Sequence, residues 1–248
     1  MYKKVKYLTA GDSAVVMEFG NEVSEEINAK IRNTIEKLEN ENIEGIIELT
    51  PTYRSITVKY NPLEISYKKL IEVLNKFENI KVDNENAKVK LVEIPTVYGD
   101  EYGQDIAFVA ENANISQEEV IKIHTGKDYL VYMLGFAPGF TYLGGMDEKI
   151  ATPRLKSPRL KIAAGSVGIA GSQTGMYPSE SPGGWQLIGR TPLKLYDEKS
   201  NPPVFINAGD YIRYVQISET EFDKIKEEVE NGTYKVSIKE ISRGELHV

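Results

Sequence analysis

Glycine is unevenly distributed along this chain. Twelve of its 20 glycines lie between Gly126 and Gly189, which is about a quarter of the 248 residues. From residue 129 to residue 214, short β-rich segments are separated by glycine and proline about every 8–12 residues. This rhythm favours a β-barrel or a β-sandwich, because glycine permits the tight turns and corners that such folds need.

The N-terminal part has a different pattern. Four short strands are predicted there, at 2–8, 14–19, 45–49 and 55–60. Ser24 and Ser66 each begin an amphipathic helix. Strands interleaved with two helices indicate a sheet covered on one side. The polar stretch 81–90 is the best linker candidate. We therefore predict an α+β protein in which a small α/β sandwich domain, 1–85, precedes a β-barrel domain, 86–248.

The second domain also contains predicted elements outside the glycine-rich region. These are a strand at 89–97, a helix at 105–111 and a closing strand at 234–240. Ser116 and Ser218, each followed three residues later by glutamate, predict two further helices that begin with capping boxes. Gly126 is expected to end the first of these in a left-handed conformation.

Composition excludes several kinds of chemistry. The chain has no cysteine, which rules out a disulfide framework, a thiolate zinc site, an iron–sulfur cluster and a cysteine nucleophile. With two histidines, His124 and His247, no metal site is expected. A net charge of −7 and a pI of about 5.2 argue against nucleic acid or a phospholipid surface as partner. Since no membrane-length apolar run or signal peptide is recognisable, we expect a cytoplasmic protein without a membrane partner.

Familiar nucleotide and serine-hydrolase motifs are missing or incomplete. The Gly126-Lys127 pair is followed by Asp128, so it does not form a P-loop. The run from Gly165 to Gly171 lacks the spacing of a dinucleotide-binding loop. Ser166 sits in an incomplete nucleophile elbow, and the residues after it read as a strand rather than a helix. A serine triad is therefore not predicted.

The acidic average conceals a basic region. Residues 126–190 carry a net charge of +3, so the remainder carries −10. Four of these cations fall between Arg154 and Lys161, beside Pro153 and Pro158. A solvated loop is one interpretation. The other is that the prolines stiffen a patch whose arginines, joined by Arg190, capture a carboxylate or phosphate.

Two more features allow both a structural and a functional interpretation. His124 ends a predicted helix, where it either bonds the last carbonyls or serves as a proton donor at the rim of a cleft. Glycine-rich loops at 135–145 and 171–185 contain aromatic residues, including Trp185, and the polar Gln173. They form either tight hairpin corners or a shaped pocket with a few polar groups.

The longest motifs resemble one family. They are His124-Thr125, the run from Gly135 to Gly145, Pro153-Arg154, Pro158-Arg159, the run from Ala164 to Gly171, Tyr177-Pro178, and the run from Pro182 to Arg190. Together with Gly11-Asp12-Ser13-Ala14, they resemble the 5-oxoprolinase B-subunit (PxpB/KipI) family, which is also known as the first subunit of allophanate hydrolase. One departure is Ala163, where the family often has proline; this conservative loop change leaves the resemblance intact.

The resemblance implies that the second domain is a cyclophilin-like β-barrel. It also implies a hydrolase subunit, inactive alone, that acts with 5-oxoprolinase subunits A and C and with ATP as co-substrate to open 5-oxo-L-proline to L-glutamate. A KipI-type inhibitor of a sensor histidine kinase is the alternative. We predict His124 as the catalytic residue and the following as substrate-binding residues: Arg154, Arg159, Gly165, Ser166, Gln173, Tyr177, Trp185 and Arg190.

Overall fold

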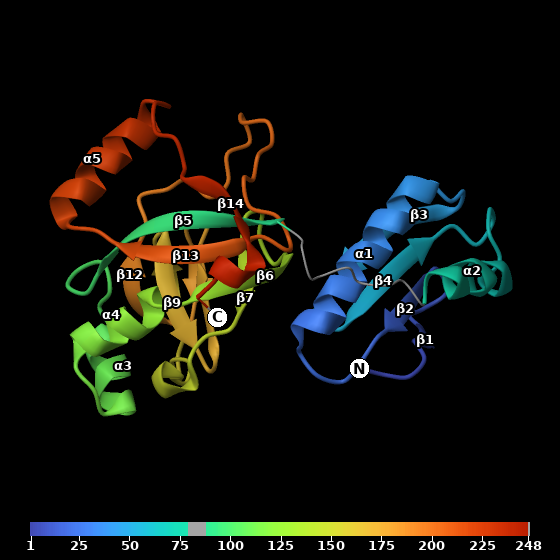
Figure 1. Ribbon diagram of the computed structural model, residues 1–248, viewed down its shortest axis with the longest axis horizontal. Coiled ribbons are helices and arrows are strands. Elements are labelled where there is room, and N and C mark those ends of the chain that lie inside the picture. The colour runs from blue at the N-terminus through green and yellow to red at the C-terminus, as the bar shows by residue number, and fades with distance from the viewer. Residues whose placement is uncertain (79–87, 248) are drawn as a thin grey trace. The chain divides into compact units, whose positions relative to one another are not determined.

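The computed structural model describes residues 1–78 and 88–247. The chain forms two compact units, residues 1–85 and 86–248 (Figure 1). Most of the predicted linker, 81–87, lies outside the described residues. No helix in the described ranges is long and apolar enough to cross a membrane.

The first unit is a four-stranded antiparallel sheet with helices. The strand order is β1-β2-β4-β3. Its elements are β1 (Lys6–Thr9), β2 (Ala14–Glu18), α1 (Glu25–Glu41), β3 (Ile46–Pro51), β4 (Ser55–Tyr60), α2 (Tyr67–Leu74) and η1 (Asn75–Phe77). As predicted, Ser24 and Ser66 cap α1 and α2, because their hydroxyl oxygens accept hydrogen bonds from the third residue beyond them. Ile27 and Ile31 of α1 then pack with Val58 of β4 in a dry core.

The second unit contains an eight-stranded sheet. Its order is β10-β9-β12-β5-β13-β6-β7, with β14 also paired to β5. The strands are β5 (Lys88–Tyr98), β6 (Asp128–Leu134), β7 (Thr141–Gly144), β9 (Ser166–Ala170), β10 (Gln173–Met176), β12 (Gln186–Arg190), β13 (Tyr211–Gln216) and β14 (Ile238–Ser242). Pairing is antiparallel except between β5 and β13. Gly175 of β10 lies against Thr141 of β7, so the two ends of the sheet approach each other and the barrel is nearly closed.

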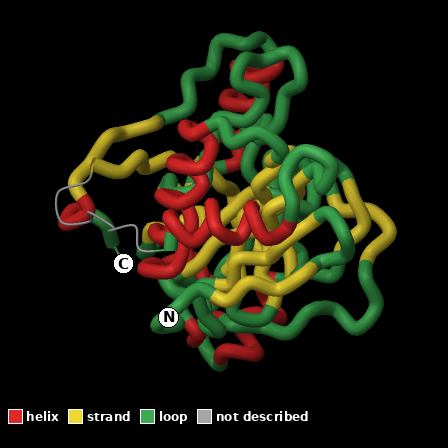
Figure 2. Tube along the Cα trace, turned by 90° about the vertical axis from the view of Figure 1, so that its right-hand side faces the viewer, coloured by secondary structure: helices red, strands yellow, loops and turns green. Residues whose placement is uncertain are grey.

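Smaller elements surround this barrel. They are α3 (Ile106–Ala113), α4 (Gln117–Thr125), η2 (Glu148–Ile150), β8 (Arg159–Ile162), β11 (Ser181–Gly183), α5 (Glu219–Glu230) and η3 (Arg243–Glu245). Strands β8 and β11 pair with each other in a separate two-stranded sheet. Helix α5 stands apart from α3 and α4 in Figure 1, and loops (green in Figure 2) connect the short strands. The structure therefore confirms the predicted mixture of helices and a β-barrel, which is nearly closed, and adds a separate small sheet.

Three local predictions differ from the structure. Gly126 ends α4 with a φ of −81° rather than a positive φ. A side chain there would meet the carbonyl oxygen of Lys122 at 2.8 Å, so steric contact, not backbone handedness, favours glycine. The closing strand was expected at 234–240 but β14 begins only at Ile238, where its pairing with Val92 of β5 starts. The Ser218–Glu221 capping box of α5 is confirmed. At α4 the predicted box is only half formed: Ser116 accepts from the Glu119 N–H, but the Glu119 carboxylate pairs with Lys149 at 3.6 Å.

Candidate functional site

An aromatic cavity of about 240 Å³ lies among β7, β11 and the loops beside them. Its lining combines five aromatic rings, an arginine and the end of β11 with the glycine after it: Phe136, Phe140, Tyr142, Arg154, Tyr177, Pro182, Gly183, Gly184 and Trp185. The Phe140 ring is the centre of the cluster. It makes edge contacts with the rings of Tyr142, Trp185 and Tyr177 at centroid distances of 5.1, 5.9 and 6.3 Å. Such edge-to-face packing fixes the rings, so the walls of the cavity are preformed.

Glycines make room for these rings. A Cβ atom at Gly175 would lie 3.1 Å from the Trp185 ring, and one at Gly183 would lie 2.3 Å from the Tyr177 hydroxyl oxygen. The glycine-rich loops therefore do form a shaped pocket. At Gly175 and Gly183 glycine is needed because a side chain would collide with the rings of the pocket. Phe136 occupies the left-handed region (φ 67°) with its ring 74% exposed at the cavity. A non-glycine residue held there stores backbone strain on the order of 1 kcal/mol.

The two arginines of the basic patch have different environments. Arg159 is bound within the protein: its Nη2 donates to Asp105 Oδ1 at 2.7 Å and its Nη1 to the Trp185 carbonyl at 3.3 Å. Arg154 is exposed, with its guanidinium carbon 5.9 Å from the Trp185 ring centroid. In the ranges that the structure describes, no carboxylate pairs with Arg154. Arg154 is thus the cation available to an anionic ligand in the cavity, and Arg159 supports the wall.

Asp105 explains how Arg159 is held. This residue precedes α3, and its second carboxylate oxygen accepts the Leu187 backbone N–H at 2.7 Å. Its own N–H donates to the Leu187 carbonyl at 2.9 Å. One carboxylate therefore connects the start of α3, strand β12 and the arginine beneath Trp185.

Tyr177 supplies a polar group to the apolar walls. Burial raises the pKa of its hydroxyl, an effect that the Trp185 backbone N–H and the two arginines partly oppose. The phenol therefore stays protonated at neutral pH and can donate a hydrogen bond into the cavity. Tyr177 and Arg154 together offer a donor and a positive charge in an otherwise aromatic space.

His124 lies elsewhere. The expectation that it sits at the rim of a cleft is wrong, because its side chain is completely buried. Its Nδ1 lies 2.8 Å from the Tyr98 hydroxyl and its Nε2 lies 2.8 Å from Thr174 Oγ1. Thr174 donates its proton to the Gly168 carbonyl, so it accepts from His124, and the proton of the neutral ring is on Nε2. Burial lowers the pKa of His124 to about 3.

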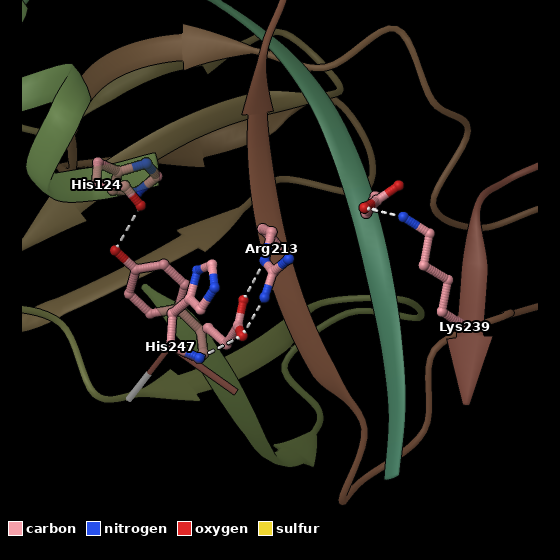
Figure 3. Close-up of polar contacts among 7 residues, drawn as sticks. His124, Arg213, Lys239 and His247 are labelled. Carbon is pink, nitrogen blue, oxygen red and sulfur yellow. Dashed lines mark hydrogen bonds and ion pairs between the residues drawn. The ribbon is translucent and has the colours of Figure 1, made fainter. Parts of the chain in front are cut away.

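The second histidine belongs to a different network (Figure 3). The Arg213 guanidinium donates two hydrogen bonds of 2.6 Å to the Asp128 carboxylate, and the His247 backbone N–H donates to the same carboxylate at 2.8 Å. The hydroxyl of neighbouring Tyr129 donates to the His124 carbonyl at 2.8 Å. These contacts tie the C-terminal segment to β6 and β13.

The remaining predicted site residues do not line the aromatic cavity. Gly165 forms a turn with a φ of 80° directly before β9, and Ser166 is buried at the start of that strand. Gln173 begins β10. Arg190 lines a second, separate cavity. Of the nine predicted residues, the structure brings Arg154, Tyr177 and Trp185 to one cavity, with Arg159 behind its wall.

Sequence reasoning did not select four residues that build this site. They are Phe136, Phe140, Tyr142 and Asp105. The alternation of aromatics with glycine between residues 135 and 145 was a signal for the first three. Asp105 had no such signal, because it lies 54 residues before its arginine.

Comparisons with known proteins agree on one family. Residues 5–206 match the family model of the carboxyltransferase domain, subdomain C and D. The B-subunit of 5-oxoprolinase from Bacillus subtilis is 47% identical, over 88% of this chain and 95% of that protein. That of Escherichia coli O157:H7 is 39% identical, over 83% of this chain and 93% of that protein. The crystal structure of the urea amidolyase from Kluyveromyces lactis shares the fold, with a TM-score of 0.79 and 24% identity over 96% of this chain and 16% of that one.

Proposed function

The chain belongs to the carboxyltransferase domain (subdomain C and D) family that includes the B-subunit of 5-oxoprolinase, and we propose that it is itself the B-subunit of an ATP-dependent 5-oxoprolinase. In this proposal the complex hydrolyses 5-oxo-L-proline to L-glutamate in the cytoplasm, together with subunits A and C. The barrel of the second unit is proposed to be of the cyclophilin-like type. The names of the relatives give no support to a kinase inhibitor.

The observation that carries the proposal is the pairing of Arg154 with an aromatic cavity. 5-Oxoproline has a planar lactam amide, a short hydrocarbon edge and one carboxylate. The aromatic lining suits the flat lactam, and the arginine suits the carboxylate. The cavity of about 240 Å³ is smaller than a typical pocket for a drug-sized ligand, which suits a substrate as small as 5-oxoproline.

The residues of this chain then bind and orient the substrate. Arg154 holds the carboxylate, and the Tyr177 hydroxyl donates to the lactam carbonyl, whose oxygen gains negative charge when a nucleophile adds to it. Net hydrolysis breaks the ring C–N bond, adding water's hydroxyl to carbon and its proton to nitrogen. We propose that the energy comes from ATP hydrolysis in the assembled complex and that this chain alone is inactive. His124, being buried, supports the barrel in this proposal.

A reconstituted assay tests this assignment. The chain is mixed with candidate subunits A and C, and 5-oxoproline-dependent ATP hydrolysis is measured. Arg154→Gln should raise KM about tenfold, since one charge-assisted hydrogen bond is lost from the bound substrate. Lys156→Gln is the matched control, because Lys156 is also exposed, two residues away and outside the cavity lining. Equal KM values for the two variants would remove Arg154 from the site. Full activity without this chain would refute the function.

A further inference from the structure

A second and larger cavity lies between α5 and the segment that follows β12. Its volume is about 580 Å³, well within the range of small-molecule sites. Arg190, Leu193 and Lys194 line it from the β12 side, and Phe222, Lys226 and Val229 line it from α5. The proposed function makes no use of this cavity.

The charges in this cavity are not balanced within the protein. Lys194 pairs with Asp197 at 3.0 Å, and Asp197 also accepts the Lys199 backbone N–H, so this lysine is neutralised. Arg190 is fixed by one hydrogen bond of 3.0 Å from its Nε to the Ala164 carbonyl. That bond leaves both terminal nitrogens of its guanidinium for another acceptor. Among the described residues, Arg190 and Lys226 form no ion pair, although the Glu230 carboxylate also lines the cavity.

The floor of the cavity is apolar. Leu193 and Phe222 are each only 5% exposed, and Val229 packs against the barrel core. A charged patch that is merely solvated does not need such a floor. Two cations without ion-pair partners and an aliphatic and aromatic surface line the same cavity, which matches a ligand that is itself amphipathic.

We propose that this cavity binds a small organic anion. Its carboxylate or phosphate group contacts the Arg190 guanidinium and Lys226 Nζ, and its hydrocarbon or aromatic body lies on Leu193, Phe222 and Val229. Glu230, which also lines the cavity, excludes ligands with a second negative charge on the body.

This site is distinct from the aromatic cavity. Tyr177 lines the aromatic cavity and Pro178 the second one. Gly165 stands between them: its N–H donates to the Tyr177 carbonyl at 2.7 Å, and its carbonyl accepts from the Thr191 N–H at 2.9 Å. The two cavities therefore share a wall, and the proposal does not depend on what the aromatic cavity binds.

Binding to the isolated full-length chain tests the proposal. Phenyl phosphate and phenylacetate are titrated separately, with inorganic phosphate as a third probe, while backbone amide shifts are followed by NMR. The amides of Thr191 and Gly232 report on this cavity, and that of Gly184 reports on the aromatic one. We expect saturable shifts at Thr191 and Gly232 with at least one aromatic anion, whose head group then identifies the ligand class.

Variants decide between this site and its alternatives. Arg190→Gln and Lys226→Gln should each weaken binding about tenfold. Lys224→Gln, on the same helix but outside the lining, and Arg154→Gln should leave it unchanged. Since Lys226 is exposed, its variant tests the idea even if Arg190→Gln misfolds. Shifts confined to Gly184, no saturable binding, or inorganic phosphate binding as tightly as phenyl phosphate would overturn the proposal.

Discussion

The buried His124 makes a quantitative prediction about stability and pH. Its pKa falls from the ordinary 6.5 in an unfolded chain to about 3 in the folded protein. The neutral ring is thus favoured by folding, so its contribution is present above pH 6.5 and is lost as the pH falls toward 3. Between pH 7 and pH 4.5 the imidazole of His124 binds a proton in the unfolded chain but stays neutral in the folded protein. This linkage lowers the free energy of unfolding by about 2.5 kcal/mol.

The contribution of His124 is isolated by measuring the free energy of unfolding in urea for the native protein and for His124→Gln at both pH values. The other titrating groups affect both proteins equally, so their effects cancel in the difference. His124→Gln should be less stable at pH 7, since it breaks the bonds to Tyr98 and Thr174, and the gap should narrow by about 2.5 kcal/mol at pH 4.5. A gap that stays constant would refute the neutral buried ring. If the variant does not fold, a His124 ring resonance that titrates above pH 5 in the native protein would refute it too.

Two other substitutions test packing and charge. Asp128→Asn should lower the free energy of unfolding by about 3 kcal/mol, because it leaves the Arg213 guanidinium without its buried carboxylate. Urea unfolding at pH 7 measures this loss, and a loss below about 1 kcal/mol would contradict the pairing. Gly183→Ala should displace the Tyr177 hydroxyl and lower the melting temperature by several degrees, whereas Gly244→Ala, with open space around it, should not. Equal melting temperatures for the two glycine variants would show that Tyr177 does not occupy this position.

Local signals made the helix starts predictable. Ser24, Ser66, Ser116 and Ser218 all cap helices, because an N-cap is formed within four residues of sequence. Helix ends were less certain. A glycine after a helix suggests a left-handed residue, but at Gly126 the nearby Lys122 carbonyl is what excludes a side chain.

The site was only partly predictable, for a related reason. Its glycines and aromatics lie in two short runs, so the existence of a pocket could be read from the sequence. The different roles of Arg154 and Arg159 could not be predicted from the sequence, because Arg159 is held by Asp105, which lies far away in the chain. The burial of His124 was also not predictable. The two residues that bond to its ring, Tyr98 and Thr174, lie 26 and 50 residues away in the chain, and its position at the end of a helix does not indicate them.

The wall at Gly165 also restricts how this protein can change. Gly165 bonds to Tyr177 of the aromatic cavity and to Thr191 of the second cavity, and a side chain at Gly165 would lie 2.3 Å from the Thr191 carbonyl oxygen, so no larger residue fits between them. The exposed Phe136 is the better place to widen the aromatic cavity, because the backbone there is already strained and the ring has solvent to move into.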